Sequence, residues 1–157
     1  MPAFRPLLLS LALAMANPAF SADCAKPAEA KAMLAQVTAD INGYRQAAGL
    51  PALVNDKKLA KSAQAHACDM AGQGQFSHFG SNGSDLVRRL KDVGYRFRSA
   101  NENIGRFRTA KTASDWWCNS APHRANMLSP KIDEMGLGVA LGADQQLYWV
   151  MVGGAAK

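Results

Sequence analysis

The sequence has few cysteines, and none of them is spaced as a cofactor site requires. Its three cysteines, Cys24, Cys68 and Cys118, form no C-x-x-C or C-x-x-C-H motif, which gives little support to a redox motif, a haem attachment site or a structural zinc site. Three cysteines allow at most one intramolecular disulfide and leave one thiol over. We favour Cys24 with Cys68, which would tie the N-terminal segment to a helix, but the sequence leaves all three pairings open.

Long hydrophobic runs are also missing, with one exception at the N-terminus. There Arg5 precedes the mostly apolar residues 7–16, and small residues surround Ser21. This is the layout of a secretory signal peptide, and its apolar part is too short to span a bilayer. We therefore expect a signal peptide over 1–21 and one mature domain over 22–157. That domain would be exported, periplasmic or extracellular, and free of transmembrane segments.

Charge of one sign is not concentrated anywhere along the chain. The formal net charge is +6, from 18 basic and 12 acidic residues, and removing residues 1–21 takes away one arginine and no acid. The remaining +5 is dispersed, which favours a solvated basic face over a nucleic-acid-binding stripe. We expect no nucleic-acid partner and a weak attraction to anionic envelope surfaces.

Apolar residues recur at helical spacing in the first part of the chain and in short runs near its end. The helical patterns predict four helices, over about 28–48, 56–72, 84–94 and 109–118. The short runs predict three strands, over 103–107, 135–141 and 146–153, the last two joined by a hairpin turn. Helices followed by a small closing sheet predict one α+β domain with an antiparallel sheet.

Three polar residues lie at the edges of these elements and not within an apolar stripe. His78 follows the second helix, Glu102 lies at the start of a strand, and His123 lies in "NSAPHRANMLSP", residues 119–130. We expect that stretch to be a proline-bounded turn in which Pro122 helps to end the fourth helix. Two imidazoles and a carboxylate could bind a divalent metal or act as a general acid and base. Their separations match no ligand motif, so unconnected loop residues remain an alternative.

Other residues of the same types have simpler interpretations. His66 lies inside the second helix beside its apolar face, so we interpret it as a packing histidine. Four aromatic residues are interpreted as packing side chains of the core and the sheet. They are Trp116, Trp117, Tyr148 and Trp149.

Four segments, in this order, closely resemble the bacterial CAP-domain family of SCP-like extracellular proteins. They are "AHACDMAGQGQFSHFGSNGSDLVRRLKDVGY", "NENIGRF", "DWWCNSAPHRANMLSPKIDEMGLGVA" and "YWVMVGG". The wider family includes cysteine-rich secretory proteins, insect venom antigens and plant pathogenesis-related proteins of group 1. The resemblance covers nearly the whole mature chain. It implies a three-layer α-β-α sandwich with about four helices and a small antiparallel sheet. It also implies a surface cleft that gathers two histidines and two acids, and in some members a divalent metal.

The family's cleft residues can be carried over one by one. The histidine of "FSH" is His78, the glutamate of "ENI" is Glu102 and the histidine of "PHRANML" is His123. The second family acid falls at Ser120, with Asn119 beside it, and neither side chain supplies negative charge. We therefore expect a cleft of these five residues, with His78, His123 and Glu102 as the metal ligands. A neutral fourth group weakens affinity for a hard cation, whereas an imidazole-rich site still suits zinc.

The resemblance implies a fold and a site more than an activity, because the family shares no common reaction. We expect an exported protein that binds a divalent metal, a lipid or a small molecule in its cleft, or that contacts the cell envelope. The alternative is a metal-assisted, peptidase-like hydrolase that uses the same residues. The missing second acid argues against it, since Glu102 would have to be both ligand and base.

Overall fold

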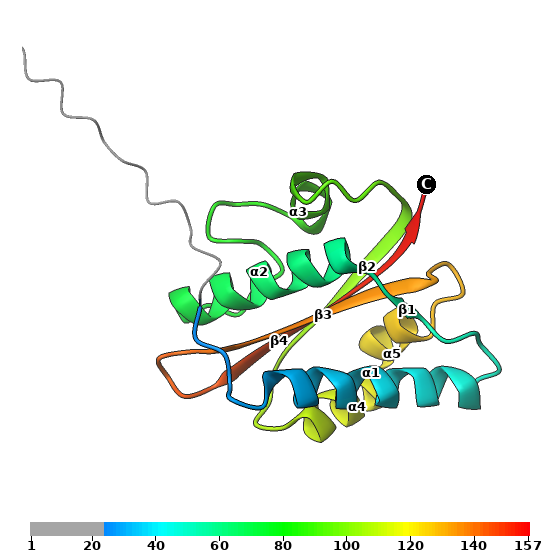
Figure 1. The fold of residues 1–157 in the computed structure, drawn as a ribbon, viewed down its shortest axis with the longest axis horizontal. Helices are drawn as coiled ribbons and strands as arrows, with labels where there is room; N and C mark the ends of the chain where they lie inside the picture. The colour runs from blue at the N-terminus through cyan, green and yellow to red at the C-terminus, as the bar shows by residue number, and fades with distance from the viewer. Residues whose placement is uncertain (1–23) are drawn as a thin grey trace, which may run out of the picture.

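The computed structural model describes residues 24–157, so the signal peptide expected over 1–21 lies outside the described residues. Five helices and four strands follow one another along this part of the chain (Figure 1). The helices are α1 (Ala30–Ala47), α2 (Lys57–Gln73), α3 (Leu86–Asp92), α4 (Ala110–Asn119) and α5 (Ala121–Met127). The strands are β1 (Val54–Asn55), β2 (Phe97–Arg106), β3 (Glu134–Leu141) and β4 (Leu147–Ala156).

The four strands form one sheet in the order β1-β3-β4-β2. Strand β4 pairs antiparallel with β2 and with β3, whereas the two-residue strand β1 pairs parallel with β3. The sheet is therefore mixed. The antiparallel pairing expected from the sequence is found among its three long strands, and β1 adds a parallel pair.

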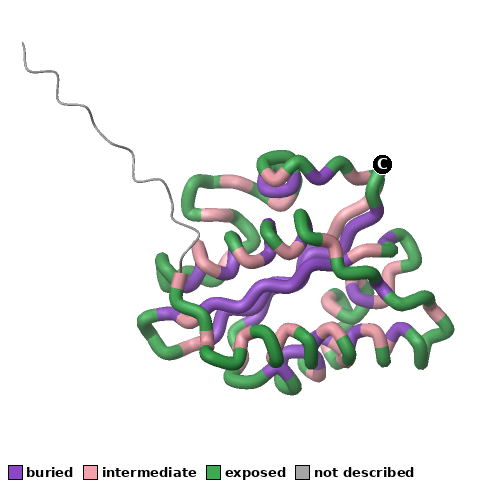
Figure 2. Tube along the Cα trace, viewed as in Figure 1, coloured by how far each residue is buried: buried purple, intermediate pink, exposed green. Residues whose placement is uncertain are grey.

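Helices cover both faces of this sheet, as the expected three-layer sandwich requires. Helices α2 and α3 lie on one side, and α1, α4 and α5 lie on the other (Figure 1). The domain has two hydrophobic cores, one on each face of the sheet, and side chains of β4 point alternately into them. Trp149 and Met151 pack with α1, α4 and α5, while Tyr148 and Val150 pack with α2 and α3. Successive side chains of a strand point to opposite faces, so a strand covered on both sides is buried along its length. Figure 2 shows the long strands as a continuous buried band.

Helix α2 lies against β3 at two glycines, Gly136 and Gly138. A Cβ at Gly138 would come within 2.5 Å of backbone atoms of Ala63 and Gln64. Real Cβ contacts are not this short, so only glycine lets the helix backbone approach the strand here.

Helix α5 differs most from the sequence expectation. Residues 121–127 are helical, with Ser120 as the N-cap and Pro122 in the first turn. Proline is tolerated there because the first-turn N–H groups have no partner within the helix, and its fixed φ suits the helix. The expectation of a proline-bounded turn was therefore wrong: Pro122 begins a fifth helix and does not end the fourth.

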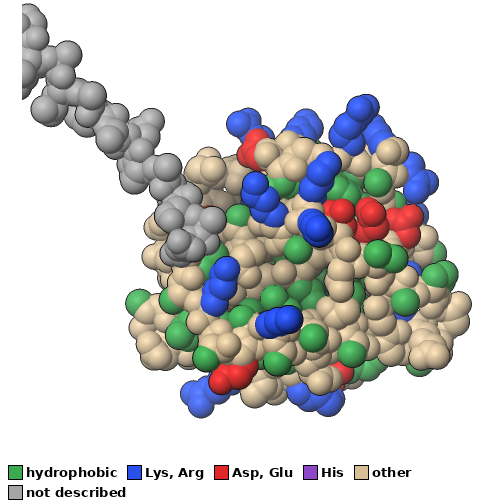
Figure 3. All heavy atoms as spheres, in the orientation of Figure 1, with side chains coloured by type: hydrophobic (Ala, Val, Ile, Leu, Met, Phe, Trp, Pro, Cys, Tyr) green, Lys and Arg blue, Asp and Glu red, His purple; other side chains and the backbone are tan. Residues whose placement is uncertain are grey.

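Three further features concern the connections and the surface. A disulfide joins Cys24 to Cys68 of α2, the pairing favoured from the sequence, and Cys118 is free within residues 24–157. In the same part of the chain, no helix is long and apolar enough to cross a membrane. On the face shown in Figure 3, the basic side chains are scattered and form no single stripe.

Candidate functional site

The centre of the site is Glu102, whose carboxylate lies on β2 with only 4% of the side chain exposed. Arg89 of α3 donates from Nη2 to Oε2 at 2.6 Å, and His78 lies with Nδ1 2.8 Å from Oε1. Burial alone would raise the pKa of Glu102, but the His78 hydrogen bond and the Arg89 charge outweigh it and lower the pKa. Glu102 is therefore ionised near neutral pH, and both of its oxygens are already occupied.

This arrangement fixes the ring of His78. An ionised carboxylate can only accept, so Nδ1 of His78 carries a hydrogen and donates it to Glu102. Two hydrogen bonds anchor the loop that holds this ring. Arg89 Nη1 donates to the His78 carbonyl at 2.9 Å, and His66 Nε2 donates to the Ser77 carbonyl at 2.9 Å. Glu102 and Arg89 thus orient His78.

The second imidazole, His123, comes from the first turns of α5. Its Nδ1 lies 2.7 Å from the Ser120 hydroxyl, and its ring centroid lies 4.8 Å from that of Trp116. Burial, with a smaller contribution from the charge of His78, lowers the pKa of His123. The ring of His123 is therefore neutral at neutral pH, and its Nδ1 either accepts a hydrogen bond from the Ser120 hydroxyl or donates one to it.

Two asparagines hold α5 against β2 and so place His123. Asn103 Nδ2 donates to the His123 carbonyl at 2.9 Å. Asn126 Nδ2 donates to the Glu102 carbonyl at 3.1 Å and to Asn103 Oδ1 at 2.8 Å. Asn103 is fully buried, so the two bonds made by its side chain satisfy polar atoms that water cannot reach.

Both imidazoles open into one cleft of about 430 Å³. Its apolar walls are Phe76, Phe107 and Trp116, with Ile104 on the strand side. Trp116 is 48% exposed and packs against Phe107 with ring centroids 5.4 Å apart. The interpretation of Trp116 as a core residue was therefore wrong, whereas Trp117, Tyr148 and Trp149 are fully buried as expected.

Four of the five predicted cleft residues lie together and one does not. His78, Glu102, His123 and Ser120 are joined by the contacts above. Asn119 is exposed, and its side chain donates to the Asp115 carbonyl within its own helix. His66 is buried in α2 as a packing residue, although its Nε2 also lies 4.0 Å from Glu102.

Arg89 is a residue of the candidate site that the sequence did not predict. It lies on the apolar face of α3, three residues after Leu86 and four before Val93, and only 9% of its side chain is exposed. A basic residue inside a buried stripe is itself a signal, because a buried charge needs a partner. That signal could have pointed to Arg89 but not to Glu102 as its partner.

The sequence predicted His78, His123 and Glu102 as the ligands of a metal ion. Within residues 24–157 no three His, Cys, Asp or Glu side chains are arranged to hold a metal ion. Glu102 is engaged by Arg89 and His78, so it does not fit as a ligand in this arrangement. The imidazoles of His78 and His123 both line the cleft, and each has Nδ1 in contact with a protein group.

Comparisons with known proteins agree with this fold. The sequence model of the cysteine-rich secretory protein family, CAP, matches residues 38–152. Two proteins of Bacillus subtilis (strain 168) are each 32% identical. The uncharacterized protein YkwD matches over 113 residues, 71% of this chain and 44% of its own length. The uncharacterized membrane protein YlbC matches over 99 residues, 62% of this chain and 29% of its own. The chain thus spans less than half the length of either relative.

Solved structures show the same architecture. An outer surface protein from Borrelia burgdorferi superposes with a TM-score of 0.78 at 19% identity, covering 86% of this chain and all of its own. An extracellular protein containing an SCP domain from Bacillus anthracis superposes with a TM-score of 0.70 at 28% identity, covering 80% of this chain and 41% of its own. The α+β sandwich and the resemblance are both confirmed, and the protein belongs to the CAP family, the cysteine-rich secretory protein family.

Proposed function

We propose that this CAP domain is an exported binding protein, and that the cleft binds its ligand through Nε2 of His78 and of His123. One observation carries the proposal. Each imidazole has Nδ1 engaged, by Glu102 or by Ser120, while Nε2 has no protein partner among residues 24–157. Two oriented imidazoles therefore present Nε2 atoms without a protein partner to the same cleft. Export is supported by the signal-peptide pattern of residues 1–21 and by the likeness to an extracellular SCP-domain protein.

The walls of the cleft suggest what kind of organic ligand would bind. Phe76, Phe107 and Trp116 offer apolar ring faces, and Nε2 of each imidazole offers a hydrogen-bonding atom. A small molecule with a flat or ring-shaped apolar part and a hydroxyl group, which can donate or accept, would use both. We favour this class over an acyl chain, because the apolar lining is short and interrupted by the two histidines.

A divalent ion is the second class of ligand that the imidazoles could take. Zinc accepts imidazole nitrogen, and water could complete its coordination. Once bound, zinc would supply a Lewis acid for an oxygen atom of an organic ligand. The protein's part would be to hold the two rings, through Glu102 and Ser120, with Nε2 free.

Hydrolysis is less well supported than binding. A metal-assisted peptidase needs a base to activate water, and no acidic residue of the described chain lines the cleft. Glu102 is bound to Arg89 and His78, and its lowered pKa makes it a weak base. We therefore propose a binding function for this cleft.

Ligand titrations followed by NMR would test the proposal. Zinc, and separately a set of small ring-bearing fragments, would be added to the wild type and to His78→Gln, His123→Gln and Asn119→Ala. We expect saturable changes at the His78 and His123 rings, and affinity at least about tenfold lower in either histidine variant. Asn119→Ala is the control, since Asn119 lies outside the cleft, and should bind as the wild type does. The proposal is wrong if neither zinc nor any fragment shifts the two rings.

A further inference from the structure

Besides its two histidines, the cleft has one lining residue with an ionisable side chain among residues 24–157, and the function proposed above does not use it. This residue is Arg106, the last residue of β2. Because successive side chains of a strand alternate between its faces, Glu102, Ile104 and Arg106 lie on the same face of β2. Arg106 therefore lies on the side of the sheet that carries the site, and it lines the cleft together with both imidazoles.

Two aromatic rings hold the guanidinium of Arg106 in place. Tyr148 of β4 is its direct partner in the register of the two strands, and Cζ of Arg106 lies 6.0 Å from the centre of the Tyr148 ring. The same atom lies 5.7 Å from the centre of the Phe76 ring, which forms a wall of the cleft. A cation this close to a ring face is attracted to it. The guanidinium is therefore held at the wall of the cleft, although Arg106 as a residue is exposed.

No carboxylate pairs with Arg106 in the described part of the chain. None of the salt bridges found there includes Arg106, and no Asp or Glu lines the cleft. Asp144 is close enough for its charge to matter: hydrogen bonds from Gln146 and Tyr148, and then the charge of Arg106, lower the pKa of Asp144. Both oxygens of Asp144 already accept those two hydrogen bonds, at 3.0 and 2.9 Å. The N–H groups of Arg106 are therefore left for a ligand.

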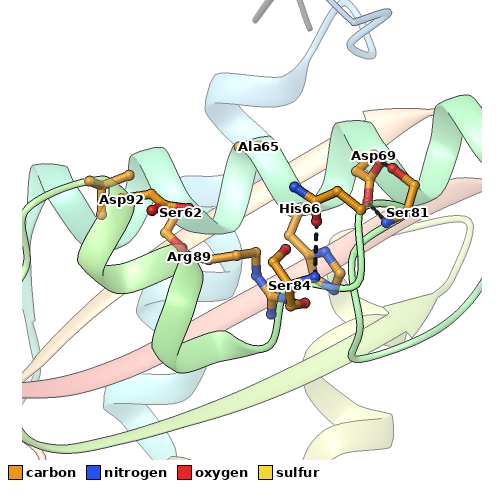
Figure 4. A pocket seen from close by; sticks show the side chains of 10 residues that line it. Ser62, Ala65, His66, Asp69, Ser81, Ser84, Arg89 and Asp92 are labelled. Atoms are coloured by element: carbon orange, nitrogen blue, oxygen red, sulfur yellow. Dashed lines mark hydrogen bonds between the residues drawn. The ribbon is translucent and has the colours of Figure 1, made fainter.

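Arg89, the other arginine near the cleft, is in the opposite situation. It lies beside Ser84, whose carbonyl accepts a hydrogen bond from Nη1 at 3.0 Å (Figure 4). Its Nη2 is paired with Glu102 at 2.6 Å, and the two side chains are 9% and 4% exposed. The charges of this buried pair cancel, so Glu102 does not neutralise Arg106. A cleft with one unpaired cation and no lining acid has a positive potential, which favours a negatively charged ligand.

We propose that Arg106 binds a carboxylate group of the cleft's ligand, so that the ligand is a ring-bearing organic acid. This rests on the binding function proposed above and narrows its class of ligand. A guanidinium donates two parallel hydrogen bonds to a carboxylate, while the ring of the ligand would lie against Phe76, Phe107 and Trp116. One cation also matches the single charge of a carboxylate. A phosphate monoester carries about −1.5 to −2 near neutral pH, so part of its charge would be unmatched.

Three matched probes would test the proposal: para-hydroxybenzoate, para-hydroxybenzamide and para-hydroxyphenyl phosphate. They share a ring and a hydroxyl group and differ in charge. Each would be titrated into the wild type while the Arg106 Nε–H and the rings of His78 and His123 are followed by NMR. We expect the carboxylate to bind at least about threefold more tightly than the amide, and this preference should shrink as salt rises from about 0.1 M to about 1 M. Tighter binding of the phosphate than of the carboxylate would overturn the choice of a carboxylate.

Two arginine variants make the outcome decisive. Arg106→Gln changes an exposed strand end, so the fold should be kept, and it should bind the carboxylate no more tightly than the amide. Arg108→Gln is the control, because Arg108 is exposed and does not line the cleft, and it should keep the wild-type preference. If the wild type binds carboxylate and amide equally, or if Arg106→Gln keeps the preference, this proposal is overturned. Shifts of the two imidazoles by the amide would then still support the binding function of the cleft, whereas the absence of any shift with all three probes would count against both.

Discussion

Replacing Glu102 by glutamine would test how the cleft is built. Glutamine has nearly the same shape and can still accept a hydrogen bond from Arg89, but it removes the negative charge. Arg89 would then be a buried cation without a counter-ion, and it cannot escape by losing a proton because its pKa is too high. His78 would lose the carboxylate that fixes its tautomer.

The size of the effect follows from the burial of the pair. The two side chains are 9% and 4% exposed, so water screens the charges poorly. Removing one partner of a buried ion pair costs about 3–5 kcal/mol. The glutamine oxygen keeps one hydrogen bond, worth about 1 kcal/mol, so we expect a loss of about 2–4 kcal/mol in the free energy of unfolding. With a urea m-value of about 2 kcal/mol/M, the unfolding midpoint should fall by about 1–2 M.

Urea unfolding at several pH values would measure this loss. The folded-state pKa of Glu102 lies below the ordinary value of 4.5, so its charge stabilises the wild type above pH 4.5. This stabilisation is lost as the pH falls through the folded-state pKa, and the difference between wild type and Glu102→Gln should shrink there. Asp92→Asn is the control: its ion pair with Arg88 is 54% and 70% exposed, and the change should cost less than about 1 kcal/mol. The argument is refuted if the difference in unfolding free energy between wild type and Glu102→Gln is the same at neutral pH and below pH 4.5. It is also refuted if Glu102→Gln loses no more stability than Asp92→Asn.

Two further predictions concern stability. Gly138→Ala should destabilise the protein by about 1–3 kcal/mol or more, because the new methyl group meets the backbone of α2. Gly43→Ala in α1 has open space around it and should stabilise the protein by about 0.5–1 kcal/mol. Thermal unfolding should therefore show a lower melting temperature for the first variant and a higher one for the second, and a shift in the same direction would contradict the packing described. Replacing Cys24 and Cys68 by alanine opens a loop with a sequence separation of 44 and should cost about 3–4 kcal/mol in urea unfolding. Cys118→Ala is the control, and an equal loss there would show that the disulfide has no special effect.

The sequence predicted the elements whose own residues carry a pattern. The apolar stripe that includes Val37 and Ile41 predicted α1, and both side chains are fully buried. Strand β2 was predicted to begin at 103, but it begins at Phe97 because residues 97–101 pair with the end of β4. These five residues, FRSAN, do not alternate between apolar and polar side chains as a half-buried strand does, so only the partner strand reveals them. The same is true of β1, whose two residues are a strand only through β3.

The sequence named candidate residues for the site but could not predict the contacts between them. The resemblance assigned His78, Glu102 and His123 by number, and these residues lie together in the structure. Spacing along the chain could not tell that Arg89 occupies one oxygen of Glu102, because the contact depends on how α3 packs over β2. It also could not assign Asn119, whose side chain points back to its own helix.

The position of β4 has a consequence for how the protein folds. β4 lies between β3 and β2, contributes to both cores, and follows every other helix and strand of the described residues in the sequence. While the chain is being synthesised, β2 and β3 therefore have no strand between them, and neither core can close until residues 147–156 have left the ribosome. Folding of the complete sheet must follow synthesis of these residues, and we expect the long-range pairing of β2 with β4 to slow it.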